Sequence, residues 1–176
     1  MVSLSVLFWM YVILFALIGG LRGWTKEILV SAGVILALFI LTVVENFIPI
    51  ISKSLTPESS FWVRMGILGA MTFFGYQTPN IPRIINSGKF MRDKFEDVLL
   101  GIFLGGINGY LIFGSAWHFL IEAGYPFEWI TAPDEVTLAG QKAHELIRIL
   151  PPQWLEPPML YIAVALIFVF ILVVFI

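Results

Sequence analysis

The side chain with the widest chemical range in this 176-residue sequence is His118, which follows Trp117 near the end of a long apolar segment. A neutral imidazole can bind a metal ion, haem iron or the magnesium of a chlorin. The second histidine, His144, lies in a separate and more polar stretch, so the two do not indicate a metal site. His118 is therefore a candidate contact for a pigment or haem. The alternative is a histidine that is hydrogen-bonded to lipid, water or a neighbouring side chain.

No arrangement typical of an enzyme accompanies it. Ser31 and Ser115 lack a histidine and acid pattern, and the sequence has no phosphate-binding glycine loop, dinucleotide fingerprint or zinc-protease motif. The absence of cysteine excludes disulfides, thiolate metal sites and cysteine nucleophiles. Charged residues stand at the ends of apolar segments, where they favour no transport pathway: Glu45, Arg64, Asp97 and Glu122. We expect no enzymatic activity and no firmly indicated cofactor.

Glycines recur every fourth residue in the same apolar segment, at Gly101, Gly105 and Gly109. Residues at this spacing share one helix face, and small residues let two membrane helices approach closely. Asn108 flanks this face, and an amide inside a membrane typically clamps a neighbouring helix, the alternative being a contact with a ligand. The glycine face is predicted to pack against the first or second helix of the same chain, or against another subunit or a second copy.

Composition indicates an integral membrane protein. The chain is 59% hydrophobic and 12% charged, with a mean hydropathy of +0.94, whereas a soluble domain has about 25% charged residues. A soluble core of this length could not hide so much apolar surface. The net charge of −2 gives no indication of nucleic-acid binding. We predict one membrane domain over residues 1–176 that has the lipid bilayer as a partner and binds no nucleic acid.

Five segments are expected to cross the bilayer, since a bilayer core needs about 20 apolar helical residues. They are Ser3–Leu21, Glu27–Val44, Phe61–Tyr76, Asp97–Ile121 and Met159–Ile176, the second reaching Ile51 if Pro49 lies at the interface. The predicted fold class is all-α, a polytopic helical bundle with about five transmembrane helices and one amphipathic interfacial helix.

The amphipathic helix belongs to a predicted outer segment, residues 122–158. Asp134 and Glu135 favour a helix start, because acidic residues stabilise the positive end of the helix dipole. Apolar residues then recur at spacings of three and four as far as Leu150, and Pro151 and Pro152 are expected to stop the helix. We predict a helix over 134–150 that either lies on the outer leaflet or packs on the outer face of the bundle.

The positions of Lys and Arg predict the orientation. Six of the ten lie between spans one and two or three and four, and they are Arg22, Lys26, Arg83, Lys89, Arg92 and Lys94. The remaining four are Lys53, Arg64, Lys142 and Arg148. The first set is expected in the cytoplasm, which places the N-terminus outside and, with five spans, the C-terminus in the cytoplasm.

A short charged turn, Gly19–Glu27, joins the first two spans. It carries Gly20, Arg22 and Gly23 before Glu27, and Asp97 opens the fourth span. With the glycines of that span, these residues resemble the colicin V production protein family of small bacterial inner-membrane proteins, over about residues 1–121. The family's motif usually has a basic residue after the acid, where this chain has Val98, and the fifth span (159–176) is additional to the usual four.

The resemblance implies a non-enzymatic protein of the bacterial inner membrane, linked in the family to export and envelope phenotypes. The first hypothesis is accordingly a scaffold or assembly protein. The second is an accessory transmembrane subunit of a respiratory or photosynthetic complex, and a small transporter or channel subunit comes last. The motif charges suggest an ion pair of Arg22 with Asp97 or Glu96, the alternative being charges that act independently.

Overall fold

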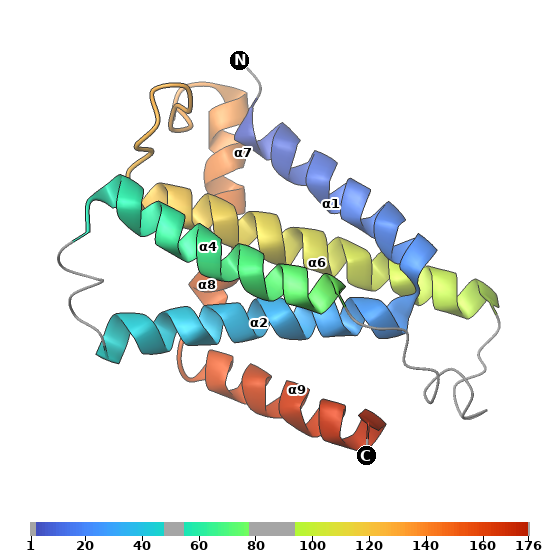
Figure 1. The fold of residues 1–176 in the computed structure, drawn as a ribbon. Coiled ribbons are helices and arrows are strands. Elements are labelled where there is room, and N and C mark those ends of the chain that lie inside the picture. The colour runs from blue at the N-terminus through green and yellow to red at the C-terminus, as the bar shows by residue number, and fades with distance from the viewer. Residues whose placement is uncertain (1–2, 48–54, 78–93, 176) are drawn as a thin grey trace.

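The computed structural model describes residues 3–47, 55–77 and 94–175. Within these residues every regular element is a helix, which confirms the predicted all-α class (Figure 1). The helices are α1 (Leu4–Arg22), α2 (Trp24–Phe47), α4 (Pro57–Tyr76), α6 (Lys94–Glu122), α7 (Leu138–Ile147), α8 (Pro151–Trp154) and α9 (Met159–Phe175). Three of these, α1, α2 and α6, are long and apolar enough to cross a membrane, and this fits a membrane location.

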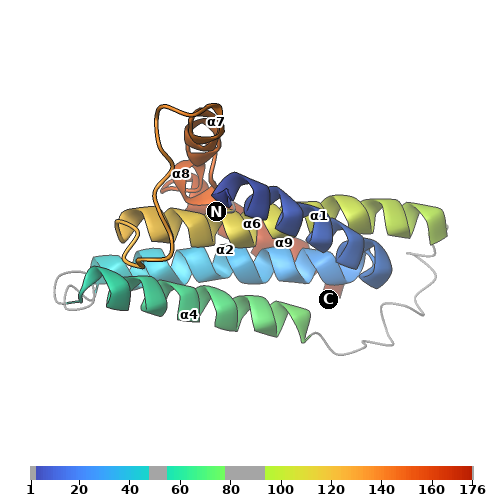
Figure 2. The same ribbon diagram turned by 90° about the horizontal axis from the view of Figure 1, so that it is seen from above.

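The long helices form an up-and-down bundle. Helices α1, α4 and α9 run in the direction opposite to α2 and α6, while α9 lies on the outside of α2 (Figure 1). Helix α6 is central, since it packs on α1, α2 and α4. Seen from above, α4 and α7 lie on opposite sides of the bundle (Figure 2). The cations Lys53, Arg83, Lys89 and Arg92, and the predicted extension to Ile51, lie outside the described residues.

The turn between α1 and α2 is much shorter than predicted. Gly19 and Gly20 continue α1 as far as Arg22, and Gly23 alone separates the two helices. Gly23 has φ +86°, a conformation that glycine adopts without the clash of a Cβ atom, and its N–H donates to the Gly19 carbonyl at 2.9 Å. Helix α2 therefore begins at Trp24, before the predicted start at Glu27.

The glycine face of α6 packs on α1 of the same chain. A Cβ atom on Gly105 would lie 2.9 Å from the Cα of Gly19, and one on Gly109 would lie 2.9 Å from the Cα of Val12. A Cβ atom on Gly101 would meet the Gly19 carbonyl. The two backbones thus touch along this face, which leaves no room there for another subunit while α1 is in place.

The outer segment differs from its predicted helix at both ends. Helix α7 begins at Leu138 because Asp134 forms a turn instead, its Oδ1 accepting from the backbone N–H groups of Val136 at 3.0 Å and Thr137 at 2.6 Å. Pro151 and Pro152 open the short helix α8, as proline suits a first turn. Ala143 and Leu150 are buried against Phe8 and Trp117. The segment therefore packs on the bundle, the second of the two predicted arrangements.

Candidate functional site

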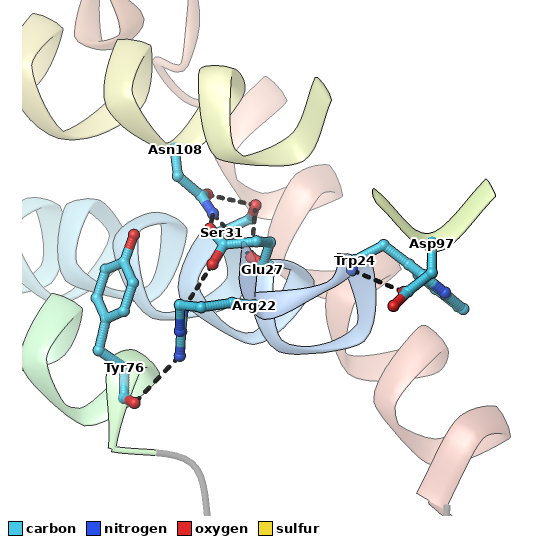
Figure 3. Close-up of polar contacts among 7 residues, drawn as sticks. All are labelled: Arg22, Trp24, Glu27, Ser31, Tyr76, Asp97 and Asn108. Atoms are coloured by element: carbon cyan, nitrogen blue, oxygen red, sulfur yellow. Dashed lines mark hydrogen bonds and ion pairs between the residues drawn. The ribbon is translucent and has the colours of Figure 1, made fainter. Parts of the chain in front are cut away.

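Five polar side chains meet inside the bundle near the α1–α2 turn, and we call them the hairpin cluster: Arg22, Glu27, Ser31, Tyr76 and Asn108. They come from α1, α2, α4 and α6 (Figure 3). Glu27 and Asn108 are both 0% exposed. A carboxylate and an amide buried to this extent need partners, because each loses its hydration on folding.

The carboxylate of Glu27 is held from two helices. Its Oε1 accepts a hydrogen bond from Nη1 of Arg22 at 2.5 Å, and this contact is also an ion pair. Its Oε2 accepts from Nδ2 of Asn108 at 2.8 Å. The negative charge is therefore balanced by a neighbour on the same hairpin and oriented by an amide from α6.

Asn108 ties α6 to α2 with its whole amide group. Its Nδ2 also donates to the backbone carbonyl of Glu27 at 2.9 Å, and its Oδ1 accepts from Oγ of Ser31 at 2.6 Å. Both sides of the amide are thus satisfied by α2 (Figure 3). Asn108 thus bridges α6 to α2, which is the kind of interhelical contact that the sequence favoured for it over a ligand contact.

Arg22 extends the cluster to α4. Its Nη2 donates to the carbonyl of Tyr76 at 3.2 Å, and its guanidinium carbon lies 4.3 Å from the centre of the Tyr76 ring. Tyr76 is the last residue of α4, where the carbonyls carry the partial negative charge of the helix dipole. The hydroxyl oxygen of Tyr76 is itself buried and has no hydrogen-bond partner among the residues that the structure describes.

Asp97 makes a separate contact at the same end of the bundle. Its Oδ1 accepts from the backbone N–H of Trp24 at 3.2 Å, so a carboxylate from α6 caps the first residue of α2. A Cβ atom on Gly23 would lie 2.8 Å from Oδ2 of Asp97, so the glycine makes space for the cap. The expected ion pair of Arg22 with Asp97 or Glu96 is replaced by Arg22 with Glu27 and Asp97 with a backbone amide.

The structure thus brings together the residues of the predicted hairpin motif. Gly20 packs on α6, where its Cβ atom would lie 2.7 Å from Cγ1 of Ile102. Ser31 and Tyr76 were missed as members of the site. Ser31 stands four residues after Glu27 and hence on the same helix face, a signal present in the sequence. The position of Tyr76 depends on how α4 packs, and no local pattern indicates it.

A second polar group lies at the opposite end of the bundle, and we call it the Arg64 cluster: Glu45, Arg64, His118, Glu122 and Gln153. Nε of Arg64 lies 2.8 Å from Oε1 of Glu45, and its Nη1 pairs with Glu122. The cluster joins α2, α4, α6 and α8.

His118 belongs to this second group. Its Nε2 lies 3.7 Å from Oε2 of Glu122, and its Nδ1 lies 3.4 Å from Nε2 of Gln153. Both ring nitrogens therefore face protein side chains. This arrangement agrees with the predicted alternative to a pigment or haem contact, in which His118 bonds to a neighbouring side chain. Among the described residues, no group of three or more His, Asp or Glu could hold a metal ion.

Comparison with protein-family models, curated proteins and solved structures found no match for this chain. The hairpin cluster and the Arg64 cluster each provide a set of charge-assisted contacts, one near each end of the bundle. In the hairpin cluster the guanidinium of Arg22 and the amide of Asn108 are both bonded to the carboxylate of Glu27. This geometry is suited to fixing helices rather than to proton transfer to a substrate.

Proposed function

We propose that the chain is a non-enzymatic scaffold or assembly protein of the bacterial inner membrane. One observation carries the proposal, namely that the buried carboxylate of Glu27 is bonded on both oxygens by Arg22 and Asn108. A general base or an ion-binding carboxylate needs a lone pair that a substrate or ion can reach, and the Glu27 side chain is 0% exposed. A carboxylate that is shared between two helices acts instead as a fixed joint of the bundle.

The resemblance to the colicin V production family is part of this proposal. It is supported by the position of Asp97, which is 73 residues from Trp24 in sequence and yet lies beside the turn that carries Gly20, Arg22, Gly23 and Glu27. A motif whose members contact one another has a physical reason to occur as a set.

The proposed topology has five spans. Glu27 and Glu45 mark the two polar clusters on α2, and they are about 27 Å apart along the helix at 1.5 Å per residue. This separation fits a bilayer core of about 30 Å. Helix α4 has 20 residues and α9 has 17, and both lie alongside α2. The end with Arg22 and Lys26 is assigned to the cytoplasm, with the N-terminus outside.

The first test is purification from native membranes in a mild detergent, followed by quantitative mass spectrometry and an absorption spectrum. A colourless peak that contains this chain alone, as a discrete oligomer, supports a free-standing scaffold. A second arm measures ion flux in proteoliposomes that contain the purified chain. Flux in the wild type that is lost in Glu27→Gln would overturn the proposal, because Glu27 would then be a transport site.

An accessory subunit of a larger bioenergetic complex is the second candidate, and α9 favours it. Helix α9 contacts α2, while residues along it are exposed and apolar, including Ile162, Leu166 and Val169. Such a helix can take a place between larger subunits as readily as in lipid. In that case the purified peak contains stoichiometric partner chains, and photocrosslinkers at Leu166 join α9 to one of them.

A further inference from the structure

An apolar cavity of about 270 Å³ lies between α1, α4 and α6, near the end of the bundle that holds the Arg64 cluster. Its floor on α6 includes Ala116 and Phe113, and its walls include Leu7 of α1 and Met65 of α4. The small side chain of Ala116 leaves the floor open. On α6 the lining extends from Phe113 to Leu120, about 10 Å along the helix axis.

The divergence of α1 and α4 creates this space. At the hairpin end the two helices meet through Phe15 and Tyr76, whose ring centres are 6.1 Å apart. Toward the other end the cavity separates them, and α6 lies beneath. The deep end is closed by Tyr11 and Phe113, which stack with centres 3.8 Å apart and planes 2° from parallel.

The chain between α6 and α7 forms a roof of aromatic rings at the other end. This chain crosses from the α4 side of the bundle to the α7 side (Figure 2). Phe127 packs on Phe61 and Trp62 of α4, with ring centres 5.3 and 5.8 Å apart, and on Trp129 at 5.4 Å. Trp62 and Trp129 line the cavity and are 57% and 75% exposed, so the cavity opens at the surface beside them.

We propose that this cavity holds the acyl chain of one membrane lipid, with its headgroup beside Trp62 and Trp129. Exposed tryptophans favour the level of lipid headgroups, which places the mouth at the interface. The cavity extends from there for about 10 Å, most of the roughly 15 Å that one leaflet contributes to a 30 Å hydrocarbon core. Its volume of about 270 Å³ is too small for a helix of a second copy, which is about 10–12 Å wide with side chains.

Dispersion contacts with the surrounding rings favour this site over the bulk bilayer. Transfer from lipid into an apolar cavity removes no water from the acyl chain, so the preference comes from packing against fixed aromatic surfaces. The indole Nε1–H of Trp117 donates to the hydroxyl of Tyr125 at 3.3 Å. The polar atom of Trp117 is therefore satisfied by the protein, while its side chain lines the cavity. The proposal rests on the membrane location proposed above and does not depend on the scaffold role.

The test uses the full chain in nanodiscs of phosphatidylethanolamine and phosphatidylglycerol, with a fraction of the phospholipid carrying a diazirine in one acyl chain. After photolysis, mass spectrometry locates the labelled residues. We expect Leu7, Met65 and Phe113 to be labelled more strongly than exposed Leu166 on α9. In Ala116→Phe, which fills the floor, we expect cavity labelling to fall about fivefold, the effect of losing a few packing contacts.

Ala70→Phe on the exposed face of α4 is the matched control, and its cavity labelling should equal that of the wild type. Trp129→Ala, a change at an exposed roof residue, provides a second variant that does not disturb the core. It should lower cavity labelling because the lipid loses the contact with the Trp129 ring at the mouth of the cavity. Labelling of the cavity no stronger than that of Leu166, or unchanged in both Ala116→Phe and Trp129→Ala, would overturn the lipid site alone. Absence of label from Leu166 and the cavity together would overturn the membrane location as well.

Discussion

The single Nδ2 group of Asn108 donates to Glu27 twice, to its carboxylate at 2.8 Å and to its backbone carbonyl at 2.9 Å. The two residues are 81 positions apart in sequence, and both are fully buried. The contact therefore fixes both the register and the rotation of α6 against α2. Its loss should be felt as loss of stability, since each partner is left without hydration or a hydrogen bond.

Replacing Asn108 by leucine should lower the free energy of unfolding by about 2 kcal/mol, because the Glu27 carboxylate loses a buried donor. Reversible unfolding by SDS titration from mixed micelles measures the change. Asn46→Leu, the same substitution at an exposed position of α2, is the matched control and should have little effect. Asn108→Asp should be worse than Asn108→Leu, since it adds a second carboxylate beside Glu27. Equal stability of Asn108→Leu and Asn46→Leu would contradict the clamp.

Arg22 and Glu27 should be energetically coupled. Arg22→Gln alone should cost about 3 kcal/mol, because it leaves a buried carboxylate without its counter-charge. In a Glu27→Gln background the same change should cost much less, and a double-mutant cycle by SDS unfolding measures the difference. The pair Arg22→Gln and Asp97→Asn serves as comparison and should be closer to additive. A larger coupling with Asp97 than with Glu27 would restore the ion pair that the sequence suggested.

Gly105 and Gly106 allow a test of the close contact between α1 and α6. Gly105→Ala should destabilise the bundle by about 2 kcal/mol, since its Cβ atom would meet the carbonyl of Phe15 and force the backbones apart. Gly106→Ala should be tolerated, because its Cβ atom would lie 3.7 Å from that of Ala16, an ordinary contact. Thermal unfolding in detergent compares the two. Similar behaviour of the two variants would show that α1 does not pack on this face.

Asp97 should stabilise α2 chiefly as a hydrogen-bond acceptor. Asp97→Ala is expected to cost about 1 kcal/mol, the usual effect of losing a helix cap. Asp97→Asn should recover most of that loss, because the amide oxygen still accepts from Trp24 N–H, although the charge at the dipole is gone. SDS unfolding of the two variants decides the point. If asparagine is no better than alanine, the charge of Asp97 is what matters.

Asp134 lies outside the bundle, and its contribution to stability should depend on pH. The backbone N–H of Thr137, with its hydroxyl, holds the pKa of Asp134 below its ordinary value of 3.8. A lowered folded-state pKa means that the carboxylate contributes stability at pH values above the ordinary value, and that this contribution is lost as the pH falls through the lowered one. NMR titration of the Thr137 amide should follow that loss. In Asp134→Asn the amide shift should no longer change in this range.

Much of the fold could be predicted because long apolar runs have few alternatives in a membrane protein. The four-residue spacing of Gly101, Gly105 and Gly109 likewise identified a packing face. The turn is shorter than the sequence predicts, because the first apolar run stops at Leu21 and the second is expected to begin only at Glu27, whereas the helices continue to Arg22 and from Trp24. The start of α7 was missed because the side chain of Asp134 competes with the helix for backbone amides.

The polar contacts were less accessible to sequence reasoning. A helical spacing shows that Ser31 shares a face with Glu27, but the partner of that face depends on how the helices are arranged. The sequence suggests an ion pair of Arg22 with Asp97 or Glu96, or charges that act independently, because these residues are expected at the same membrane surface. The structure gives the guanidinium to Glu27 and to the end of α4, which depends on the one-residue turn at Gly23.

The pairing of Arg22 with Glu27 has a consequence for biosynthesis. Asn108 leaves the ribosome 81 residues after Glu27, a delay of roughly 4 to 16 seconds at 5–20 residues per second. Throughout that interval Asn108 is absent, yet the carboxylate already has a partner five residues away on the same hairpin. The first two helices can therefore enter the bilayer with Arg22 and Glu27 already paired. Helix α6 later supplies the amide of Asn108, which completes the hydrogen bonds of Glu27.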